Sequence, residues 1–213
     1  MKLYSYWRST TSYRVRAALN LKGLAYDTVP VDLVAGEQRA PDYRVLNPGA
    51  GVPVLVLEDG TALTQSMAIL DYLDALWPEP CLIPDDPLKR ARVMAAAHTV
   101  ALDIHPVNNL RVIGQLKERF GATPEQAKDW MCYWMAEGFG AVEMQVQDDT
   151  AFAFGDTPGL ADLCITAQAY NARRWGLDLA PFPNVSRIEA NALDIPAIIA
   201  AHPDNQPDAK EAP

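Results

Sequence analysis

The sequence predicts an α/β domain with the element order βαβ–ββα, followed by an all-α domain. Three observations predict this order: short β-rich segments alternate with helical ones up to about residue 80, an Asp-Gly turn separates two apolar runs there, and no segment after Pro87 has a strand pattern. A chain of 213 residues suffices for one or two domains. We therefore place the domains at residues 1–80 and 87–213, joined by the proline-rich stretch 78–87.

The first half begins with a strand–helix–strand unit. Residues 2–6 form a short β-rich segment, and residues 13–22 have apolar side chains at helical spacing before Gly23 ends the helix. Residues 26–33 alternate as a second strand, and Pro30 within it lacks the N–H that an inner strand needs. We expect this strand at an edge of the sheet, with a right-handed crossover between the two strands.

A β-hairpin and a helix complete the first half. Asp59-Gly60 lies between apolar runs at residues 54–57 and 61–63, which predicts a tight turn between two strands. Ser66 is placed to cap the helix that follows, which ends at Trp77-Pro78. The apolar stripe of that helix consists of Met67, Ile69, Leu70, Leu73 and Leu76.

The second half is predicted to be helical throughout. The expected helices span residues 88–120, 125–147, 159–175 and 185–192, with breaks at Gly121, Gly155-Asp156 and Pro181-Phe182-Pro183. Residues 202–213 are polar and contain prolines, which predicts a mobile tail.

Composition and charge exclude several classes of function. With 18 Lys and Arg against 27 Asp and Glu, the net charge of −9 argues against a nucleic-acid partner. No apolar run approaches the roughly 20 residues of a membrane-spanning helix, and the N-terminus lacks the apolar block of a secretory signal. The three cysteines are odd in number and widely spaced, which disfavours disulfides, zinc and dithiol redox chemistry. We therefore predict a soluble, cytoplasmic protein with no metal, nucleic-acid or membrane partner.

The first candidate site is the segment at residues 8–12, between the first strand and the first helix. Free backbone N–H groups and the positive end of the helix dipole meet there, and its hydroxyls can donate hydrogen bonds. The segment therefore suits an anion or a thiolate. The alternative is that Thr11 or Ser12 only caps the helix.

Two further signals lie in the same domain. Val52-Pro53 precedes the third strand, and a cis bond there would present the backbone amide and carbonyl of Val52 to a peptide-like ligand, although only about 5% of X–Pro bonds are cis. Gln65-Ser66 begins a second helix whose N-terminus suits a carboxylate. Capping alone also explains Ser66.

In the helical half, residues 103–111 place one His, two Asn and one Arg around Pro106. Polar residues at such a kink serve a cavity or the capping of a helix end, and the two remain equally open. Arg173-Arg174 suits either a substrate or the negative end of a helix. His98 is expected to be structural, and Cys81, Cys132 and Cys164 are expected to pack as small apolar residues.

Taken together, these motifs resemble those of glutathione transferases, and in detail those of the zeta class, which includes maleylacetoacetate and maleylpyruvate isomerases. Residues 4–16 (Tyr-Ser-Tyr-Trp-Arg-Ser-Thr-Thr-Ser-Tyr-Arg-Val-Arg) match the class signature S-S-C-S-W-R-V-R. Further matches span nearly the whole chain: Leu46-Asn47-Pro48, Val52-Pro53, Gln65-Ser66, residues 103–111, Ala161-Asp162-Leu163 and residues 202–208.

The resemblance implies a fold and an activity. The first domain would be a thioredoxin-like, glutathione-binding domain, and the second a helical, substrate-binding domain. The protein would be a homodimeric cis–trans isomerase of aromatic catabolism, with glutathione as cofactor and a small keto-dicarboxylate as substrate. The double bond would isomerise through reversible addition of a thiolate.

The resemblance also implies roles for individual residues. Ser9 would stabilise the thiolate of glutathione, and Ser9, Thr10 and Arg8 would form the catalytic set. Arg8, Arg111 and Arg174 would face the carboxylate and the oxygen atoms of the substrate. The residues that would hold glutathione are Ser9, Thr10, Gln38, Val52, Pro53, Gln65, Ser66, His105, Asn109 and Arg111.

Two of the departures from the signature change the chemistry of the side chain. Thr11 replaces the cysteine, which removes the thiol needed for a mixed disulfide and weakens a reductase interpretation, and Tyr13 replaces the tryptophan. Two alternatives remain open: a general glutathione transferase or dehalogenase acting on small halogenated acids, and a transferase-like binding module without catalysis. The sequence also leaves open whether maleylacetoacetate or maleylpyruvate is the substrate.

Overall fold

The computed structural model of the chain describes residues 1–209, and they form two compact units. The first unit consists of Met1–Leu82 together with the chain from Leu193 onward, and the second is Ile83–Ala192. The sequence analysis assigned all of residues 87–213 to the second domain, so the division differs in the C-terminal segment. The reason is that this segment packs on α1 (Thr10–Leu21), the first helix of the chain. The two segments are far apart in the sequence, so local sequence patterns do not predict this contact.

The first unit is built on a four-stranded mixed sheet with the order β2-β1-β3-β4. β1 and β2 are parallel, whereas β3 pairs antiparallel with both β1 and β4. The predicted hairpin and the predicted edge position of the strand that contains Pro30 are therefore both confirmed. The strands are β1 (Lys2–Ser5), β2 (Asp27–Pro30), β3 (Val54–Val56) and β4 (Ala62–Thr64).

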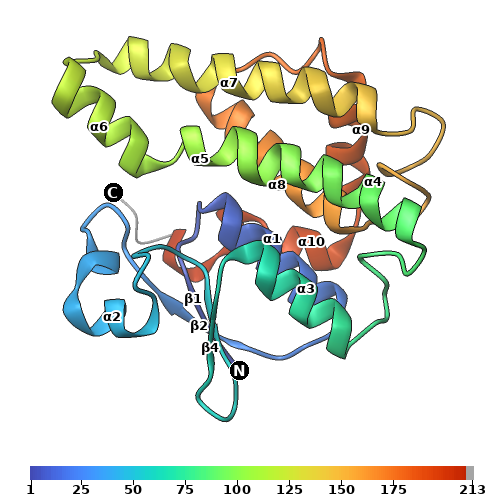
Figure 1. Cartoon of the computed structure of the whole chain (residues 1–213), viewed down its shortest axis with the longest axis horizontal. Coiled ribbons are helices and arrows are strands. Elements are labelled where there is room, and N and C mark those ends of the chain that lie inside the picture. The colour runs from blue at the N-terminus through green and yellow to red at the C-terminus, as the bar shows by residue number, and fades with distance from the viewer. Residues whose placement is uncertain (210–213) are drawn as a thin grey trace. The chain divides into compact units, whose positions relative to one another are not determined.

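Helices cover both faces of this sheet. Figure 1 shows α1 (Thr10–Leu21) and α3 (Ser66–Leu76) on one side and α2 (Pro41–Leu46) on the other. Tyr43 of α2 packs with Val31 and Val54 in a buried apolar cluster. The sequence analysis missed α2 and the short 3-10 helix η1 (Glu37–Arg39), because neither is long enough to show a helical period.

The chain after Leu193 completes the first unit. Its helix α10 (Pro196–Ala201) packs on α1 and is followed by two 3-10 turns, η3 (Pro203–Asn205) and η4 (Pro207–Ala209). The prediction of a mobile tail is wrong for residues 202–209, because their polar groups have partners: the side-chain amide of Gln206 donates to two carbonyls, and Asp208 accepts from the backbone N–H of Trp7. The predicted mobility of residues 210–213 lies outside the described residues.

The second unit is helical, as predicted, and Ile83–Ala192 contains only one isolated β-bridge. α8 is its central helix and is buried along most of its length. The expected single helix over residues 88–120 is wrong, because the chain changes to a π-helix after His98 and breaks again before Leu110. The helical elements are α4 (Pro87–His98), η2 (Thr99–Ile104), α5 (His105–Val107), α6 (Leu110–Phe120), α7 (Pro124–Gln145), α8 (Leu160–Trp175) and α9 (Pro183–Ala192). No helix in residues 1–209 is long and apolar enough to cross a membrane.

Close packing of α7 against the π-helix yields a stability prediction. A Cβ atom at Gly138 would lie 2.2 Å from Cγ1 of Ile104, whereas one at Gly140 would meet nothing within 4 Å. We expect Gly138→Ala to cost about 1–3 kcal/mol through overpacking and Gly140→Ala to stabilise the helix by up to about 1 kcal/mol. Thermal denaturation of the two variants measures both effects, and shifts of equal sign would contradict this packing.

A second prediction concerns Asp162 at the start of α8. Its carboxylate accepts from the N–H groups of Ala153 (2.7 Å) and Gly159 (2.8 Å). Burial raises the pKa of Asp162 to about 6, although these N–H groups and Arg187 act in the opposite direction. Because the unfolded-state pKa is about 3.9, the folded state binds the proton more tightly, so the contribution of Asp162 to stability is complete below about pH 4 and falls as pH rises through about 6.

We therefore expect the destabilisation caused by Asp162→Asn to shrink by up to about 3 kcal/mol between pH 4 and pH 7.5. Denaturant unfolding of both proteins across this pH range measures the difference. A destabilisation that grows with pH would show that the two N–H groups outweigh burial and hold the pKa below its ordinary value.

Candidate active site

Ser9 lies at the N-terminus of α1, where the chain leaves β1. It is the N-cap residue, and its Oγ accepts from the backbone N–H of Ser12 at 3.2 Å. The alternative that Thr11 or Ser12 caps this helix is therefore wrong: the helix begins one turn earlier than the apolar spacing indicates. Thr10 is the first helical residue and is buried. Ser9 thus combines a hydroxyl with the positive end of the helix dipole.

A chain of hydroxyl hydrogen bonds joins Ser9 to Val52. The Ser9 Oγ and the Thr11 Oγ1 are 2.9 Å apart, and Thr11 donates to the carbonyl oxygen of Val52 at 2.9 Å. Since a hydroxyl has only one proton to donate, the bond between the two hydroxyls has Ser9 as its donor. Thr11, the residue that replaces the signature cysteine, therefore connects the Ser9 side chain to the backbone of Val52.

The Val52–Pro53 peptide bond is cis, as the resemblance implied. The loop before it is fixed through the carbonyl of Gly51, which accepts from the hydroxyl of Tyr43 at 2.6 Å and from the side-chain amide of Asn47 at 2.8 Å. Burial raises the pKa of the Tyr43 hydroxyl above its ordinary value, so this donor keeps its proton. The backbone of Val52 is consequently held at the start of β3.

The N-terminus of α3 lies in the same unit. The expected cap, Ser66, is instead the first residue of the helix, and the N-cap is Gln65, which makes no side-chain capping bond. Gln65 has a φ of 69°, a backbone conformation that non-glycine residues rarely adopt and that clusters at ligand sites. Ser66 is buried, and Nη1 of Arg14 approaches its hydroxyl oxygen at 3.5 Å.

Arg8 and Gln38 are the other predicted site residues of this unit. The guanidinium of Arg8 lies over the rings of Tyr6 and Trp7, at 5.6 and 5.3 Å from their centroids. The side-chain nitrogen of Gln38 donates to the carbonyl of Leu33 at 3.3 Å, and its buried Oε1 has no hydrogen-bond partner. Two cation–π contacts thus position the Arg8 guanidinium next to the start of α1.

The remaining four predicted site residues lie in the second unit. His105 begins α5, directly after the π-helix, and Asn109 is the N-cap of α6, accepting from the N–H of Arg111 at 3.1 Å. The predicted kink within one helix is replaced by a break, because α5 ends at Val107 and α6 begins at Leu110. A π-helix, a type that is common at functional sites, directly precedes this segment. Arg174, near the end of α8, donates to Asn171 and lies over the ring of Trp175 at 4.7 Å.

The sequence analysis gave no role to Arg14, although it quoted this residue within the signature. Arg14 and Arg16 are both fully buried in α1. The sequence did contain a feature that could have drawn attention to Arg14: two arginines, separated by one residue, lie inside a helix whose other side chains are largely apolar. The expectation that all three cysteines pack as small apolar residues is wrong for one of them: Cys164 is buried and Cys132 is partly buried, but Cys81 is exposed.

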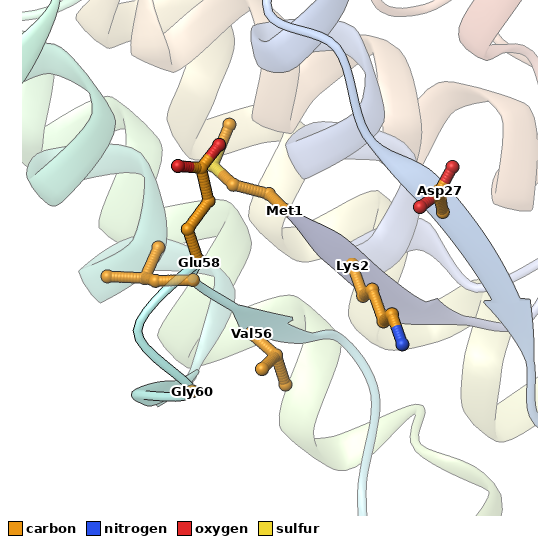
Figure 2. A pocket seen from close by; sticks show the side chains of 7 residues that line it. Met1, Lys2, Asp27, Val56, Glu58 and Gly60 are labelled. Atoms are coloured by element: carbon orange, nitrogen blue, oxygen red, sulfur yellow. The ribbon is translucent and has the colours of Figure 1, made fainter.

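A pocket of about 320 Å³ lies at the other end of the sheet (Figure 2). It is lined by the start of β1 and by the β3–β4 turn, with Lys2, Asp27 and Glu58 among its residues. Its charges are mixed, and it lies far along β1 from Ser9, which follows the other end of that strand. Residues 1–209 contain no group of three or more His, Cys, Asp or Glu that could hold a metal.

The fold and the site together define a class of protein. A thioredoxin-like sheet, a cis-proline before β3 and a serine hydroxyl at the N-terminus of α1, followed by a helical unit, form the architecture of glutathione transferases. The family model for the glutathione S-transferase N-terminal domain matches residues 8–76.

Comparison with known proteins shows which group within this class the chain resembles. Maleylacetoacetate isomerase of Pseudomonas aeruginosa is 46% identical over 214 residues, which cover 100% of both chains. The holo structure of a bacterial zeta-class maleylpyruvate isomerase has a TM-score of 0.94 at 40% identity, covering 98% of this chain and 99% of that one. A maleylacetoacetate isomerase of Methylobacterium extorquens, with bound malonate and glutathione, has a TM-score of 0.94 at 39% identity and full coverage of both. The chain belongs to the zeta-class glutathione transferase family, with the maleylacetoacetate and maleylpyruvate isomerases.

Proposed function

We propose that this protein is a glutathione-dependent cis–trans isomerase of maleylacetoacetate or maleylpyruvate, in the breakdown of aromatic compounds. One observation carries the proposal: the Ser9 hydroxyl caps α1 and is linked through Thr11 to the Val52 carbonyl, beside a cis-proline. A site for a thiol-containing peptide needs a hydroxyl and a helix N-terminus that stabilise its thiolate. It also needs a fixed backbone peptide group that pairs with the backbone of the ligand.

Residues of the first unit fit glutathione along its length. Ser9 and Thr10 suit its thiolate, Val52 with Pro53 its cysteinyl backbone, and Gln65 with Ser66 its γ-glutamyl carboxylate. Gln38, whose buried Oε1 lacks a partner, suits the glycyl end. We propose that the second unit contributes His105, Asn109 and Arg111. When bound, glutathione supplies the thiolate that adds reversibly to the cis double bond.

The role of the first unit is to favour the anionic form of this thiol. A hydrogen bond donated by Ser9 and the dipole of α1 both stabilise a thiolate. Each tenfold gain in the thiolate-to-thiol ratio corresponds to about 1.4 kcal/mol of such stabilisation. Ser9 must therefore redirect the hydrogen bond that its hydroxyl donates, from the Thr11 Oγ1 to the sulfur, when the cofactor binds.

The role of the arginines is to bind and polarise the substrate. We propose that Arg8, Arg111 and Arg174 face its carboxylates and the oxygen on which negative charge develops during the reaction. A planar guanidinium binds a carboxylate through two parallel hydrogen bonds and cannot lose its charge, which suits it to this task better than lysine. Residues 1–80 would thus bind glutathione and the helical domain the substrate.

Ultraviolet absorbance assays with maleylacetoacetate and maleylpyruvate, with and without glutathione, test the proposal. We expect glutathione-dependent isomerisation of at least one substrate, and the larger kcat/KM identifies the physiological one. Binding of glutathione without isomerisation of either substrate would contradict the proposal. Release of halide from chlorinated acids would then indicate a transferase or dehalogenase, and its absence a binding module.

We also propose that the protein is a cytoplasmic homodimer. The zeta-class resemblance supports the dimer, and three unpaired cysteines suit a compartment that keeps thiols reduced. Light scattering tests the first point: a mass near twice the 23.4 kDa of the chain is expected, and a mass equal to one chain would contradict it.

A further inference from the structure

Two buried arginines of α1 differ in the number of hydrogen bonds that their guanidinium groups donate. Arg14 and Arg16 are 1% and 0% exposed. The guanidinium of Arg16 donates through all three nitrogens, to the carbonyls of Ala201, Tyr6 and Trp7 and to the hydroxyl of Ser5. Arg16 therefore has the hydrogen bonds that a structural buried cation needs.

Arg14 lacks such partners. Its Nη1 reaches only the Ser66 hydroxyl, at the long distance of 3.5 Å, and its Nε and Nη2 are buried without any hydrogen-bond partner. Within residues 1–209 no carboxylate forms an ion pair with it. A guanidinium cannot lose its proton in a protein, so Arg14 keeps an uncompensated positive charge in the interior.

The position of this charge indicates what compensates it. Ser66 is the first residue of α3, a helix of 11 residues whose N-terminal N–H groups and dipole favour an anion. The buried Arg14 guanidinium lies beside that N-terminus, with its Nη1 3.5 Å from the Ser66 hydroxyl oxygen. Three independent sources of positive potential therefore meet at one place: the helix dipole, the hydroxyl proton and the buried guanidinium.

We propose that Arg14 is a positioning residue for the γ-glutamyl carboxylate of glutathione and acts through Ser66. Its hydrogen bond directs the Ser66 hydroxyl proton outward to the ligand, and its charge strengthens anion binding at the N-terminus of α3. This inference rests on the proposed function, because the proposed ligand is glutathione. It implies a trade-off in which the ligand-free protein is destabilised by Arg14 and the complex is stabilised by it.

The test combines binding and stability measurements on the full chain. Isothermal titration would measure the affinity of wild type, Arg14→Met and Arg14→Lys for S-methylglutathione, and for an analogue that lacks only the α-carboxylate of the γ-glutamyl group. Thermal denaturation without ligand gives the stability of each variant. Met approximates the length and volume of the arginine side chain without its charge, and Lys keeps the charge.

We expect Arg14→Met to weaken binding of S-methylglutathione at least 10-fold and to leave the ligand-free melting temperature unchanged or raised. Arg14→Lys should recover a part of the affinity, and all three proteins should bind the analogue without the carboxylate equally weakly. Unchanged affinity in Arg14→Met, an equal loss for both ligands, or a lower ligand-free melting temperature would overturn the inference. Failure of the wild type to bind S-methylglutathione would contradict the proposed function itself, and with it this inference.

Discussion

Replacing Ser9 by alanine is expected to lower kcat/KM for glutathione-dependent isomerisation by about 100- to 1000-fold, the usual effect of removing one donor to a developing or bound anion. The Ser9 hydroxyl donates to Thr11, and no other hydroxyl among the described residues both caps α1 and contacts Thr11. Loss of the cap costs only about 1 kcal/mol, so the variant remains folded at assay temperature. Steady-state kinetics and the ultraviolet absorbance of bound thiolate measure the effect.

Thr11→Val is the matched control for this prediction. It removes the neighbouring hydroxyl with little change of shape, but leaves Ser9 and the start of α1 in place. Because Thr11 donates to the carbonyl of Val52, its loss should loosen the loop before β3 and lower kcat/KM by less than 10-fold. An active Ser9→Ala variant, or a Thr11→Val variant that is impaired as severely, would contradict the assignment of the thiolate donor to Ser9.

Replacing Arg16 by methionine is expected to destabilise the protein by about 3–5 kcal/mol, because several buried polar groups lose their partners at once. The carbonyls of Tyr6 and Trp7 and the hydroxyl of Ser5 belong to the segment that leads from β1 to Ser9. The carbonyl of Ala201 belongs to the end of α10. Arg16 therefore holds the segment between β1 and Ser9 and the C-terminal segment on the same helix.

Thermal denaturation compared with Arg14→Met tests this second prediction. The two substitutions are identical in chemistry, lie two residues apart and remove equally buried side chains. A lower melting temperature is expected for Arg16→Met alone. An Arg16→Met variant as stable as the wild type would show that the four bonds of its guanidinium contribute little.

Local sequence patterns were sufficient to predict much of the fold of the first unit. Asp59-Gly60 predicted the β3–β4 turn because few dipeptides adopt its backbone conformation, and Gly60 indeed has a φ of 89°. Pro30 predicted the edge strand because a missing N–H is tolerated only there. Both features depend on backbone chemistry within a few residues.

Features that depend on distant partners could not be predicted. The packing of α10 and the ordered turns after it depend on bonds such as that from Trp7 to Asp208, which are 201 residues apart. The position of the α1 cap was missed for a different reason: Ser9, Thr10, Thr11 and Ser12 are four consecutive hydroxyl residues, and sequence does not distinguish which of them begins the helix.

The candidate site was located mainly by resemblance to a known family. The residue types alone favoured helix capping at residues 8–12, and they left a functional cavity and capping equally open at residues 103–111. The role of Thr11 became visible only through its bonds to Ser9 and Val52, because these residues are up to 43 positions apart in the sequence. The unsatisfied charge of Arg14 is likewise a property of the folded chain.

The most direct test of this account is the number of product molecules formed per molecule of glutathione, measured with limiting glutathione while free thiol is titrated. The account predicts many turnovers per glutathione with a constant thiol concentration, because the site of Ser9 stabilises a thiolate that is released unchanged. Loss of one thiol per product molecule would show conjugation instead, and isomerisation at the same rate without glutathione would show that Ser9 serves some other chemistry.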